Sequence, residues 1–437
     1  MRITIVGTGY VGLVSGACLA ELGHEVTCVD KDLNKISALE KGIIPIYEPG
    51  LDTLVIKNHQ AERLFFSTDL ITTAPDADAV FIAVGTPPDG IEGGADLSYV
   101  YGVANELAPV LTDGALIVTK STVPVGSGDR IRDIIEAQRP ELEFSIASNP
   151  EFLREGCAVQ DFLDPDRVIV GTNDDIGKNR MRAVYKPFID RGVDVFFTDI
   201  RTAELAKYAA NAFLATKIAF INEISDICES VKADIEQVAL CIGTDHRIGR
   251  NYLMPGPGFG GSCFPKDTLA LNKISKDAGS PSRIVRSVID SNEQRKKRMA
   301  QKIIAACGGD VDGKIIAILG LAFKANTDDM RHSPALVIIP ELIKAGASIR
   351  VYDPQAMEQA KLDLESTDAI TWCKDPYDAM KNADISTILT EWDAFRTLEP
   401  EKIKSAMNGH TIVDLRNLYG KNHMRNYGLT YISIGRP

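Results

Sequence analysis

The fold of this chain is decided by residues 2–12, Arg2-Ile3-Thr4-Ile5-Val6-Gly7-Thr8-Gly9-Tyr10-Val11-Gly12. The first five residues are rich in β-branched side chains, which predicts a short strand. The Gly-x-Gly-x-x-Gly spacing follows, and apolar and small residues then continue at helical spacing over 13–22. Glycines in this order permit a tight turn, a close approach of pyrophosphate to the backbone, and close packing of helix on strand. The stretch therefore predicts a strand–turn–helix unit whose helix N-terminus binds a dinucleotide.

An acidic residue stands where such a unit needs one. Glycine at position 23 ends the helix, and the next strand, Glu25–Val29, closes on Asp30. A carboxylate there accepts hydrogen bonds from the ribose hydroxyl pair and repels a 2′-phosphate. The sequence therefore favours NAD over NADP, and Lys31 is interpreted as a solvated surface lysine.

Further apolar strands each end in polar residues. The predicted strands are 79–84, 115–118 and 144–147. Because cofactors bind at the carboxyl edge of a parallel sheet, the residues that follow these strands are candidates for binding or catalysis. These candidates are Thr86, Lys120, Ser121, Thr122, Glu151, Arg154 and Glu155. Solvation of an ordinary loop would explain any one of them taken alone.

A long helix is predicted from Arg201 to about Lys232, where the chain has neither proline nor glycine. Glu204, Lys207, Tyr208 and Asn211 fall at i, i+3, i+4 and i+7 and so share one face. Alanines surround them, which favours a buried helix, and a buried lysine needs a partner. The pattern alone leaves a solvated stripe on a surface helix equally open.

The stretch 255–267, Pro-Gly-Pro-Gly-Phe-Gly-Gly-Ser-Cys-Phe-Pro-Lys-Asp, has the parts of a covalent active site. Its glycines let the backbone approach a ligand. A helix is predicted from Asp267 to Lys276, so that Cys263 lies near a helix N-terminus, which favours thiolate. Lys266 adds a cation, and Asp267 follows one turn later. The alternative is a glycine-rich loop with a buried cysteine.

A helix is predicted at 281–306, and residues 308–313 form a connector after it. A second strand–helix–strand pattern follows, with predicted strands at 314–319, 349–352, 384–389 and 411–413. The fold class is therefore α/β, with two doubly wound domains joined by a long helix and a helical middle region. We expect an NAD-binding domain at 1–199, a central region carrying Cys263 at 200–307, and a ligand-binding domain at 308–437. Lys324, Arg331 and Arg416 in its loops suit a phosphorylated ligand.

The overall composition is that of an ordinary soluble protein. The 437 residues carry a net charge of −12, which argues against a nucleic-acid partner and against binding to anionic lipid. The eight cysteines form no Cys-x-x-Cys pair, so neither a metal site nor a disulfide framework is indicated. No apolar run is long enough to span a membrane, and we expect a cytoplasmic protein.

Together these motifs resemble the UDP-glucose/GDP-mannose dehydrogenase family of nucleotide-sugar dehydrogenases over almost the whole chain. Its markers are the glycine turn at 7–12, Lys-Ser-Thr-Val-Pro at 120–124, Asn-Pro-Glu-Phe-Leu at 149–153, Glu-Leu-Ala-Lys-Tyr at 204–208, the cysteine stretch at 258–267, Gly-Leu-Ala-Phe-Lys at 320–324 and Asp-Leu-Arg-Asn at 414–417. The intact residues 262–267 and the Tyr252-Leu253 pair look most like the members that oxidise UDP-glucose.

The resemblance implies a homodimer or a dimer-based oligomer that oxidises UDP-glucose to UDP-glucuronate, with two NAD, one water, and a thiohemiacetal and thioester on Cys263. The implied catalytic residues are Cys263, Lys207, Asn211, Asp267, Glu151 and Thr122. The implied cofactor-binding residues are Gly7, Gly9, Tyr10, Val11, Gly12, Asp30, Lys35, Thr86, Ser121, Thr122, Glu155, Lys266 and Arg331. The implied substrate-binding residues are Glu151, Phe152, Leu153, Arg154, Glu155, Lys207, Asn211, Arg247, Tyr252, Leu253, Gly256, Gly260, Phe323, Lys324 and Arg416, with Arg247 reaching the sugar nucleotide of a neighbouring subunit.

Several alternatives stay open at this stage. The substrate could be GDP-mannose or a UDP-N-acetylhexosamine, oxidised by the same mechanism. A two-electron dehydrogenase would leave Cys263 a structural role, and an NAD-binding regulator would need no chemistry at all. Glu151 or Asp267, with Thr122, could activate the hydrolytic water, and the group that takes the first proton is not determined.

Overall fold

The computed structural model describes residues 1–90, 93–365 and 368–436. They form two units, Met1–Ala210 with Lys273–Ala278, and Asn211–Asn272 with Gly279–Pro437. Each unit is described by itself. The division into regions 1–199, 200–307 and 308–437 follows sequence motifs and stays a prediction.

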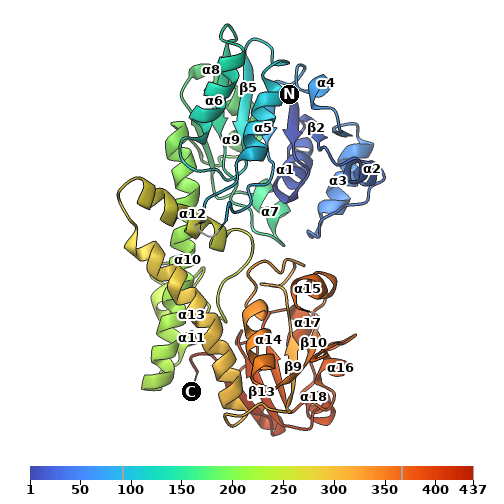
Figure 1. The fold of residues 1–437 in the computed structure, drawn as a ribbon, viewed down its shortest axis with the longest axis vertical. Helices are drawn as coiled ribbons and strands as arrows, with labels where there is room; N and C mark the ends of the chain where they lie inside the picture. Colours follow the sequence, from blue (N-terminus) through green and yellow to red (C-terminus); the bar gives the residue numbers. More distant parts are fainter. Residues whose placement is uncertain (91–92, 366–367, 437) are drawn as a thin grey trace. The chain divides into compact units, whose positions relative to one another are not determined.

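The first unit is built on an eight-stranded sheet in the order β3-β2-β1-β4-β5-β6-β7-β8. Figure 1 labels β2 and β5 of this sheet among its helices. The strands are β1 (Arg2–Val6), β2 (Glu25–Val29), β3 (Leu64–Ser67), β4 (Ala79–Ile82), β5 (Ala115–Thr119), β6 (Phe144–Ser148), β7 (Val168–Thr172) and β8 (Val195–Thr198). The pairs are parallel except for β6 with β7. Their carboxyl ends from β3 to β6 therefore meet at one edge.

Helices cover both faces of this sheet because successive strand residues point to opposite sides. In β4, Ala79 and Phe81 belong to the hydrophobic cluster under α1, whereas Val80 and Ile82 belong to the cluster under α5 and α6. The helices are α1 (Tyr10–Glu21), α2 (Leu33–Glu40), α3 (Leu51–Gln60), α4 (Leu70–Thr73), α5 (Ser98–Leu107), α6 (Ser127–Gln138), α7 (Ala158–Leu163), α8 (Asp175–Val184) and α9 (Lys186–Asp190).

The second unit has an all-parallel six-stranded sheet in the order β11-β10-β9-β12-β13-β14. The strands are β9 (Ile315–Leu319), β10 (Ser348–Tyr352), β11 (Ile370–Trp372), β12 (Ile385–Ile388), β13 (Thr411–Asp414) and β14 (Thr430–Ser433). Its helices are α11 (Ile235–Gly243), α13 (Arg283–Ala306), α14 (Ala335–Lys344), α15 (Met357–Asp363), α16 (Pro376–Met380), α17 (Asp393–Arg396) and α18 (Pro400–Ala406), with a 3₁₀ turn at Arg425–Tyr427. A single hydrophobic cluster joins the sheet to α13 and α14.

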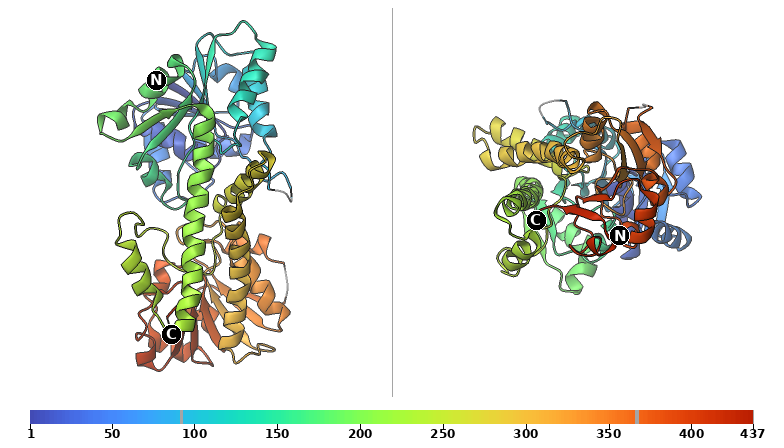
Figure 2. Two further views of the ribbon diagram at one scale, coloured as in Figure 1. Left: turned by 90° about the vertical axis from the view of Figure 1, so that its left-hand side faces the viewer. Right: turned by 90° about the horizontal axis from the view of Figure 1, so that it is seen from below.

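Helix α10 (Ile200–Val231) is one uninterrupted helix of 32 residues, drawn in green in Figure 2. The absence of proline and glycine over this length explains its continuity. The predicted face is buried: Glu204, Lys207, Tyr208 and Asn211 are each at most 6% exposed. The alternative of a solvated stripe is therefore wrong.

The predicted α/β class with two Rossmann-like sheets is confirmed. Predicted strands and helices recur within a few residues, although α12 (Phe264–Asp277) begins three residues earlier than expected. Short strands such as β3, β7 and β11 were not predicted, because they lack a clear alternation of apolar residues. Among the described residues, no helix is long and apolar enough to cross a membrane.

Candidate active site

The three glycines of the first turn have three different environments. Gly7 has a φ of +103°, and a Cβ there would lie 2.7 Å from the carbonyl oxygen of Ala83. A Cβ at Gly12 would lie 1.9 Å from the carbonyl oxygen of Gly7, so helix and turn can approach only without it. A Cβ at Gly9 would meet nothing within 4 Å. Two glycines thus serve packing, while the third leaves open space at the N-terminus of α1, where a pyrophosphate fits.

Asp30 lies beside this turn. Its Oδ2 accepts hydrogen bonds from the backbone N–H and the hydroxyl of Thr8, at 2.9 and 2.7 Å, and Lys35 Nζ lies 3.9 Å away. Burial opposes ionisation, but these hydrogen bonds and Lys35 outweigh it and lower the pKa of Asp30. The group is therefore an anion at neutral pH, as recognition of a ribose diol requires.

The other residues predicted to bind the cofactor from this unit lie in the loops after the strands or at the turn. Thr86 donates its hydroxyl to the carbonyl of Thr122, 3.1 Å away, and Ser121 donates to the carbonyl of Val84 at 2.6 Å. The loops that follow β4 and β5 are thereby joined. At the turn, Tyr10 donates its hydroxyl to Glu48, a buried carboxylate that the sequence analysis did not single out.

Glu48 ties the chain after Glu151 in place. Its two oxygens accept the backbone N–H groups of Gly156 and Ala158, at 2.6 and 2.7 Å. Because Ala158 begins α7, this carboxylate sits at the N-terminus of that helix and complements its dipole. The segment that carries Glu151 to Glu155 is thus anchored at its far end.

Glu151 and Lys207 form a buried ion pair. Lys207 Nζ lies 3.0 Å from Glu151 Oε1, and the side chains are 3% and 5% exposed. The other oxygen of Glu151 accepts the N–H of Leu153. Burial raises the pKa of Glu151, but Lys207, this backbone hydrogen bond and Lys120 outweigh it and lower the pKa. The partner that a buried lysine on α10 required is therefore a carboxylate from the loop after β6.

Glu204 has a different task from its neighbour on the same face. Its oxygens accept the N–H groups of Gly126 and Gly128 at 2.7 and 2.8 Å, at the start of α6. Burial raises its pKa to about 7. Glu204 therefore anchors α10 on the helix that follows the 120–124 segment.

Cys263 immediately precedes α12. Its carbonyl accepts the N–H of Asp267 at 2.8 Å, so the cysteine ends the glycine loop as the helix begins. The thiol is half-buried, and the hydroxyl of Ser262 lies 3.4 Å from its sulfur. A thiol at this place feels the positive end of the helix dipole, which favours the thiolate.

Asp267 is 1% exposed and has two partners. Asn211 donates its side-chain amide to Oδ2 at 2.6 Å, and Lys266 Nζ lies 2.7 Å from Oδ1. The amide of Asn211 is therefore oriented, with its Nδ2 on the carboxylate and its Oδ1 directed elsewhere. The second unit thus holds a thiol, a buried carboxylate, an oriented amide and a cation within one turn of α12 and the start of its α10 segment.

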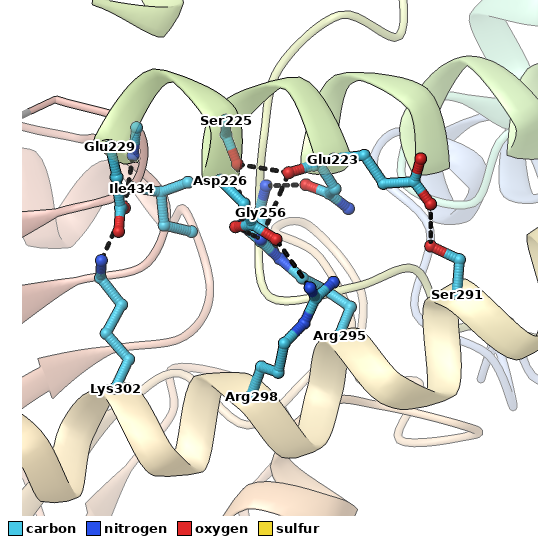
Figure 3. A network of polar contacts seen from close by, with 12 residues as sticks. Glu223, Ser225, Asp226, Glu229, Gly256, Ser291, Arg295, Arg298, Lys302 and Ile434 are labelled. Carbon is cyan, nitrogen blue, oxygen red and sulfur yellow. Dashed lines mark hydrogen bonds and ion pairs between the residues drawn. The ribbon is translucent and has the colours of Figure 1, made fainter. Parts of the chain in front are cut away.

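A polar clamp between α10 and α13 fixes the glycine loop before Cys263 (Figure 3). The N–H of Gly256 donates to Asn222 Oδ1 at 2.8 Å, and its carbonyl accepts Arg295 Nε at 3.0 Å. Arg295 is 1% exposed and also binds Asp226 and Ser225. Phe259, three residues after Gly256, donates its N–H to Asn292 Oδ1 at 2.8 Å, and its carbonyl accepts Asn292 Nδ2 at 3.0 Å.

Two predicted ligand-binding residues from the last 120 residues, Arg416 and Phe323, lie beside the same loop. Arg416 donates to the carbonyl oxygens of Phe323 and Leu389, at 2.9 and 2.8 Å. A Cβ at Gly256 would lie 3.0 Å from its guanidinium. At Gly261, a Cβ would lie 2.7 Å from the Phe323 ring. Only glycine lets this loop lie so close to the sheet of the second unit.

Other predicted residues lie in different surroundings. A Cβ at Gly260 would meet the carbonyl of His332. The Lys324 ammonium lies 5.3 Å from the centroid of the Phe323 ring, and Arg331 pairs with Asp329 at 2.8 Å. Arg247 is exposed and pairs with Asp245, Leu253 is buried, and Tyr252 adopts a φ of +65°. In the first unit, Arg154 pairs with Asp161, and the Phe152 ring carries Arg167 on its face at 3.9 Å.

Comparison with known proteins decides the family. Residues 1–189 match the NAD binding domain of the UDP-glucose/GDP-mannose dehydrogenase family, residues 201–294 its central domain, and residues 317–421 its UDP binding domain. A UDP-glucose 6-dehydrogenase of Rhizobium meliloti is 52% identical over 439 residues, covering 100% of both chains. The chain belongs to this family.

Solved structures of the family agree with the fold. A UDP-glucose dehydrogenase of Pyrobaculum islandicum superposes with a TM-score of 0.89 at 36% identity, covering 99% of this chain and 96% of that one. A UDP-D-ManNAc dehydrogenase of Pyrococcus horikoshii gives 0.87 at 26% identity, covering 100% and 99%. The predicted family, the predicted NAD cofactor and the oxidoreductase class are thus confirmed.

Some residues that build this dehydrogenase's candidate site escaped the sequence analysis. Glu48, Asn222, Asn292 and Arg295 are buried polar groups whose partners lie 33 to 110 positions away in the chain. A usable signal existed for α13 alone, where Asn292 and Arg295 stand at i and i+3 in a helix otherwise rich in exposed charges. The individual binding and catalytic roles of the predicted residues stay predictions.

Proposed function

We propose that this chain oxidises the primary alcohol of UDP-glucose to the carboxylate of UDP-glucuronate in two oxidation steps. The observation that carries the proposal is the half-buried Cys263 at the start of α12, one turn from the buried Asn211–Asp267 pair. The relatives named UDP-glucose 6-dehydrogenase over the full length support the choice of sugar nucleotide.

NAD, when bound, supplies a hydride acceptor in each of the two oxidations. The residues of the chain hold it: the open space at Gly9 receives the pyrophosphate, and the carboxylate of Asp30 receives the ribose diol. A phosphate at the 2′ position would meet the ionised Asp30. The cradle therefore fits the cofactor that the family profile implies.

In the first oxidation the substrate alcohol loses a hydride from carbon and a proton from oxygen, giving an aldehyde. Lys207 and Asn211 are the proposed stabilisers of the developing alkoxide, one by charge and one by hydrogen bonding. The thiolate of Cys263 then adds to the aldehyde carbon. A C–S bond forms, the carbonyl oxygen takes a proton, and the product is a thiohemiacetal on the enzyme.

The second oxidation removes a hydride and a proton from the thiohemiacetal and leaves a thioester on Cys263. Water attacks this thioester, the C–O bond forms, the C–S bond breaks, and carboxylate, thiol and a proton result. Glu151 and Asp267 are both carboxylates able to accept a proton from that water, and Thr122 is proposed to position it. Both carboxylates are proposed bases, since each is buried with a cation beside it.

Counting NADH separates this function from its alternatives. Two NADH per UDP-glucose consumed are expected, with UDP-glucuronate as product by mass spectrometry. One NADH per sugar and an aldehyde product would indicate a two-electron dehydrogenase and a structural Cys263. GDP-mannose and UDP-N-acetylglucosamine in parallel test the sugar nucleotide, because faster oxidation of either one would move the assignment within the family.

We also propose that two copies associate through α10. Phe213, Phe220 and Ile227 recur at intervals of seven on this helix and are 66%, 50% and 54% exposed. Such a stripe of apolar side chains suits helix packing between subunits. Sedimentation should give a dimer that Phe220→Glu weakens, whereas Phe196→Glu, at an equally exposed phenylalanine of β8, should leave it intact. A monomeric wild type would refute the proposal.

Arg247 is proposed to act on the sugar nucleotide of a neighbouring subunit. Its side chain is 78% exposed and pairs with Asp245 in the same turn. Mixing Arg247→Ala and Cys263→Ala subunits should restore part of the activity, because hybrid dimers then hold one intact site. No recovery after verified subunit exchange would count against the shared site.

A further inference from the structure

Lys120 is a buried cation with no assigned role in the chemistry above. It follows the last residue of β5, Thr119, and is 4% exposed. Its Nζ donates to the side-chain oxygen of Asn149 at 3.0 Å and to the backbone carbonyl of the same residue at 3.3 Å. Lys120 thus hydrogen-bonds both the backbone carbonyl and the side-chain oxygen of Asn149, the residue two positions before Glu151.

Asn149 is itself held from several sides. Its N–H donates to the carbonyl of Thr119 at 2.9 Å, and its side-chain amide donates to the carbonyl of Ile169 at 2.8 Å. The hydroxyl of Tyr185 donates to the oxygen that Lys120 also binds. With Pro150 next in the chain, the turn that carries Glu151 has little freedom. Lys120 is the charged member of this anchor.

Two buried lysines contribute positive charge to the single buried carboxylate of Glu151. Lys207 reaches it directly, and Lys120 contributes a second positive charge from the loop after β5. The other groups that face Lys120 are neutral: Asn149, Tyr185, and the Phe162 ring at 5.6 Å. The pKa of Lys120 is lowered to about 8: burial is the largest cause, Glu151 opposes it, and Lys207 adds to the lowering. One carboxylate therefore serves two buried cations.

We propose that Lys120 is a positioning residue for Glu151: it fixes the turn that carries the carboxylate and supplies the second cation that keeps it ionised. The inference deepens the proposed function, since Glu151 acts there as an acceptor of protons only while it is an anion. If Lys120 only anchored the turn, its replacement would leave the ionisation of Glu151 unchanged.

The experiment compares Lys120→Met with Tyr185→Phe in the full-length protein. Both variants remove hydrogen bonds to Asn149, but only the first removes charge. With UDP-glucose and NAD, the acidic limb of the kcat profile should move up by about one pH unit in Lys120→Met, as expected for loss of a nearby opposite charge. At pH values below the limb, kcat should fall roughly tenfold. In Tyr185→Phe the acidic limb should stay at the wild-type pH. In Lys120→Arg, which keeps the positive charge, it should also lie near the wild-type pH.

A second measurement is independent of turnover. In protein labelled with carbon-13 at the glutamate carboxyls, Glu151→Gln identifies the Glu151 signal, whose titration should shift upward in Lys120→Met. If that variant does not fold, Lys120→Gln, which keeps a donor for Asn149, replaces it. Equal titration in wild type and variant would overturn the inference, and so would limbs that move alike in Lys120→Met and Tyr185→Phe. A wild type that does not oxidise UDP-glucose would refute the proposed function, and the NMR titration would still decide the role of Lys120.

Discussion

At the scale of single residues, each carboxylate of the candidate site has its own charged or N–H partners. Asp30, Glu151 and Asp267 each keep a cation or several N–H donors within hydrogen-bonding reach. Removing water from a carboxylate is costly unless such partners are present. These partners therefore hold the three anions in place, as their proposed roles in cofactor binding and alcohol oxidation require.

Asp30 should set the choice of cofactor. A 2′-phosphate beside this carboxylate is expected to cost on the order of 2 kcal/mol, so kcat/KM should favour NAD over NADP by roughly thirtyfold. Asp30→Asn keeps an acceptor for Thr8 but removes the charge, and it should shrink the preference. The measurement is kcat/KM for both cofactors in both proteins. Equal values for NAD and NADP in the wild type would contradict this role of Asp30.

The Glu151–Lys207 pair should appear in the pH dependence of stability. Lys207→Met leaves a buried anion short of its direct partner and should lower the free energy of unfolding at pH 7.5 by about 3 kcal/mol. The lowered pKa of Glu151 means that its contribution is present above the unfolded-state pKa and is lost as pH falls through the folded-state value. The deficit of the variant should therefore shrink toward pH 4.

Urea unfolding at several pH values checks this expectation. The double variant Glu151→Gln with Lys207→Met is the control, because it removes both charges and should recover most of the loss at pH 7.5. A deficit that stays constant with pH would show that packing, and not the charge of Lys207, supports the site.

At the scale of elements, the glycine turn separates binding from folding. Gly9→Ala adds a methyl group to open space, at an extended φ of −72° that any residue adopts, and should leave the melting temperature unchanged. It should still weaken NAD binding at least tenfold, because the pyrophosphate is proposed to occupy that space. Gly12→Ala forces a Cβ to 1.9 Å from the Gly7 carbonyl and should destabilise by about 3 kcal/mol. Calorimetry of unfolding and of NAD binding tests both, and normal NAD affinity in Gly9→Ala would refute the assignment.

The clamp between α10 and α13 offers a similarly matched pair. Arg295 is buried and holds the carbonyl of Gly256, whereas Arg298 is half-exposed and pairs with Asp226 at 3.0 Å. Arg295→Met should cost about 3 kcal/mol of stability, and Arg298→Met less than about 1 kcal/mol. The rate at which iodoacetamide alkylates Cys263 should also differ from that of the wild type in Arg295→Met but not in Arg298→Met. Equal behaviour of the two variants would show that the clamp does not govern the cysteine loop.

At the scale of the whole molecule, local patterns could be predicted and distant pairings could not. The turn at Gly7 and Gly12 follows from neighbouring residues, and so does the continuity of α10. A buried lysine at position 207 needs a partner, but that partner, Glu151, lies 56 positions earlier in the chain, and no periodicity connects the two. Glu48 and Arg295 escaped notice for the same reason, since tertiary contacts alone turn an ordinary charged residue into an anchor.

The measurement that tests the central claim most directly is the turnover of Cys263→Ser with UDP-glucose and NAD, followed by intact-mass analysis. Serine is far harder to ionise than cysteine, so kcat should fall by several powers of ten, about 4 kcal/mol or more of barrier. The variant should still bind NAD, and the mass should show either a trapped sugar ester or unmodified enzyme. Cys157→Ser and Cys241→Ser, at exposed cysteines, serve as controls and should retain activity. Near-normal steady-state turnover of Cys263→Ser would contradict covalent catalysis by this thiol.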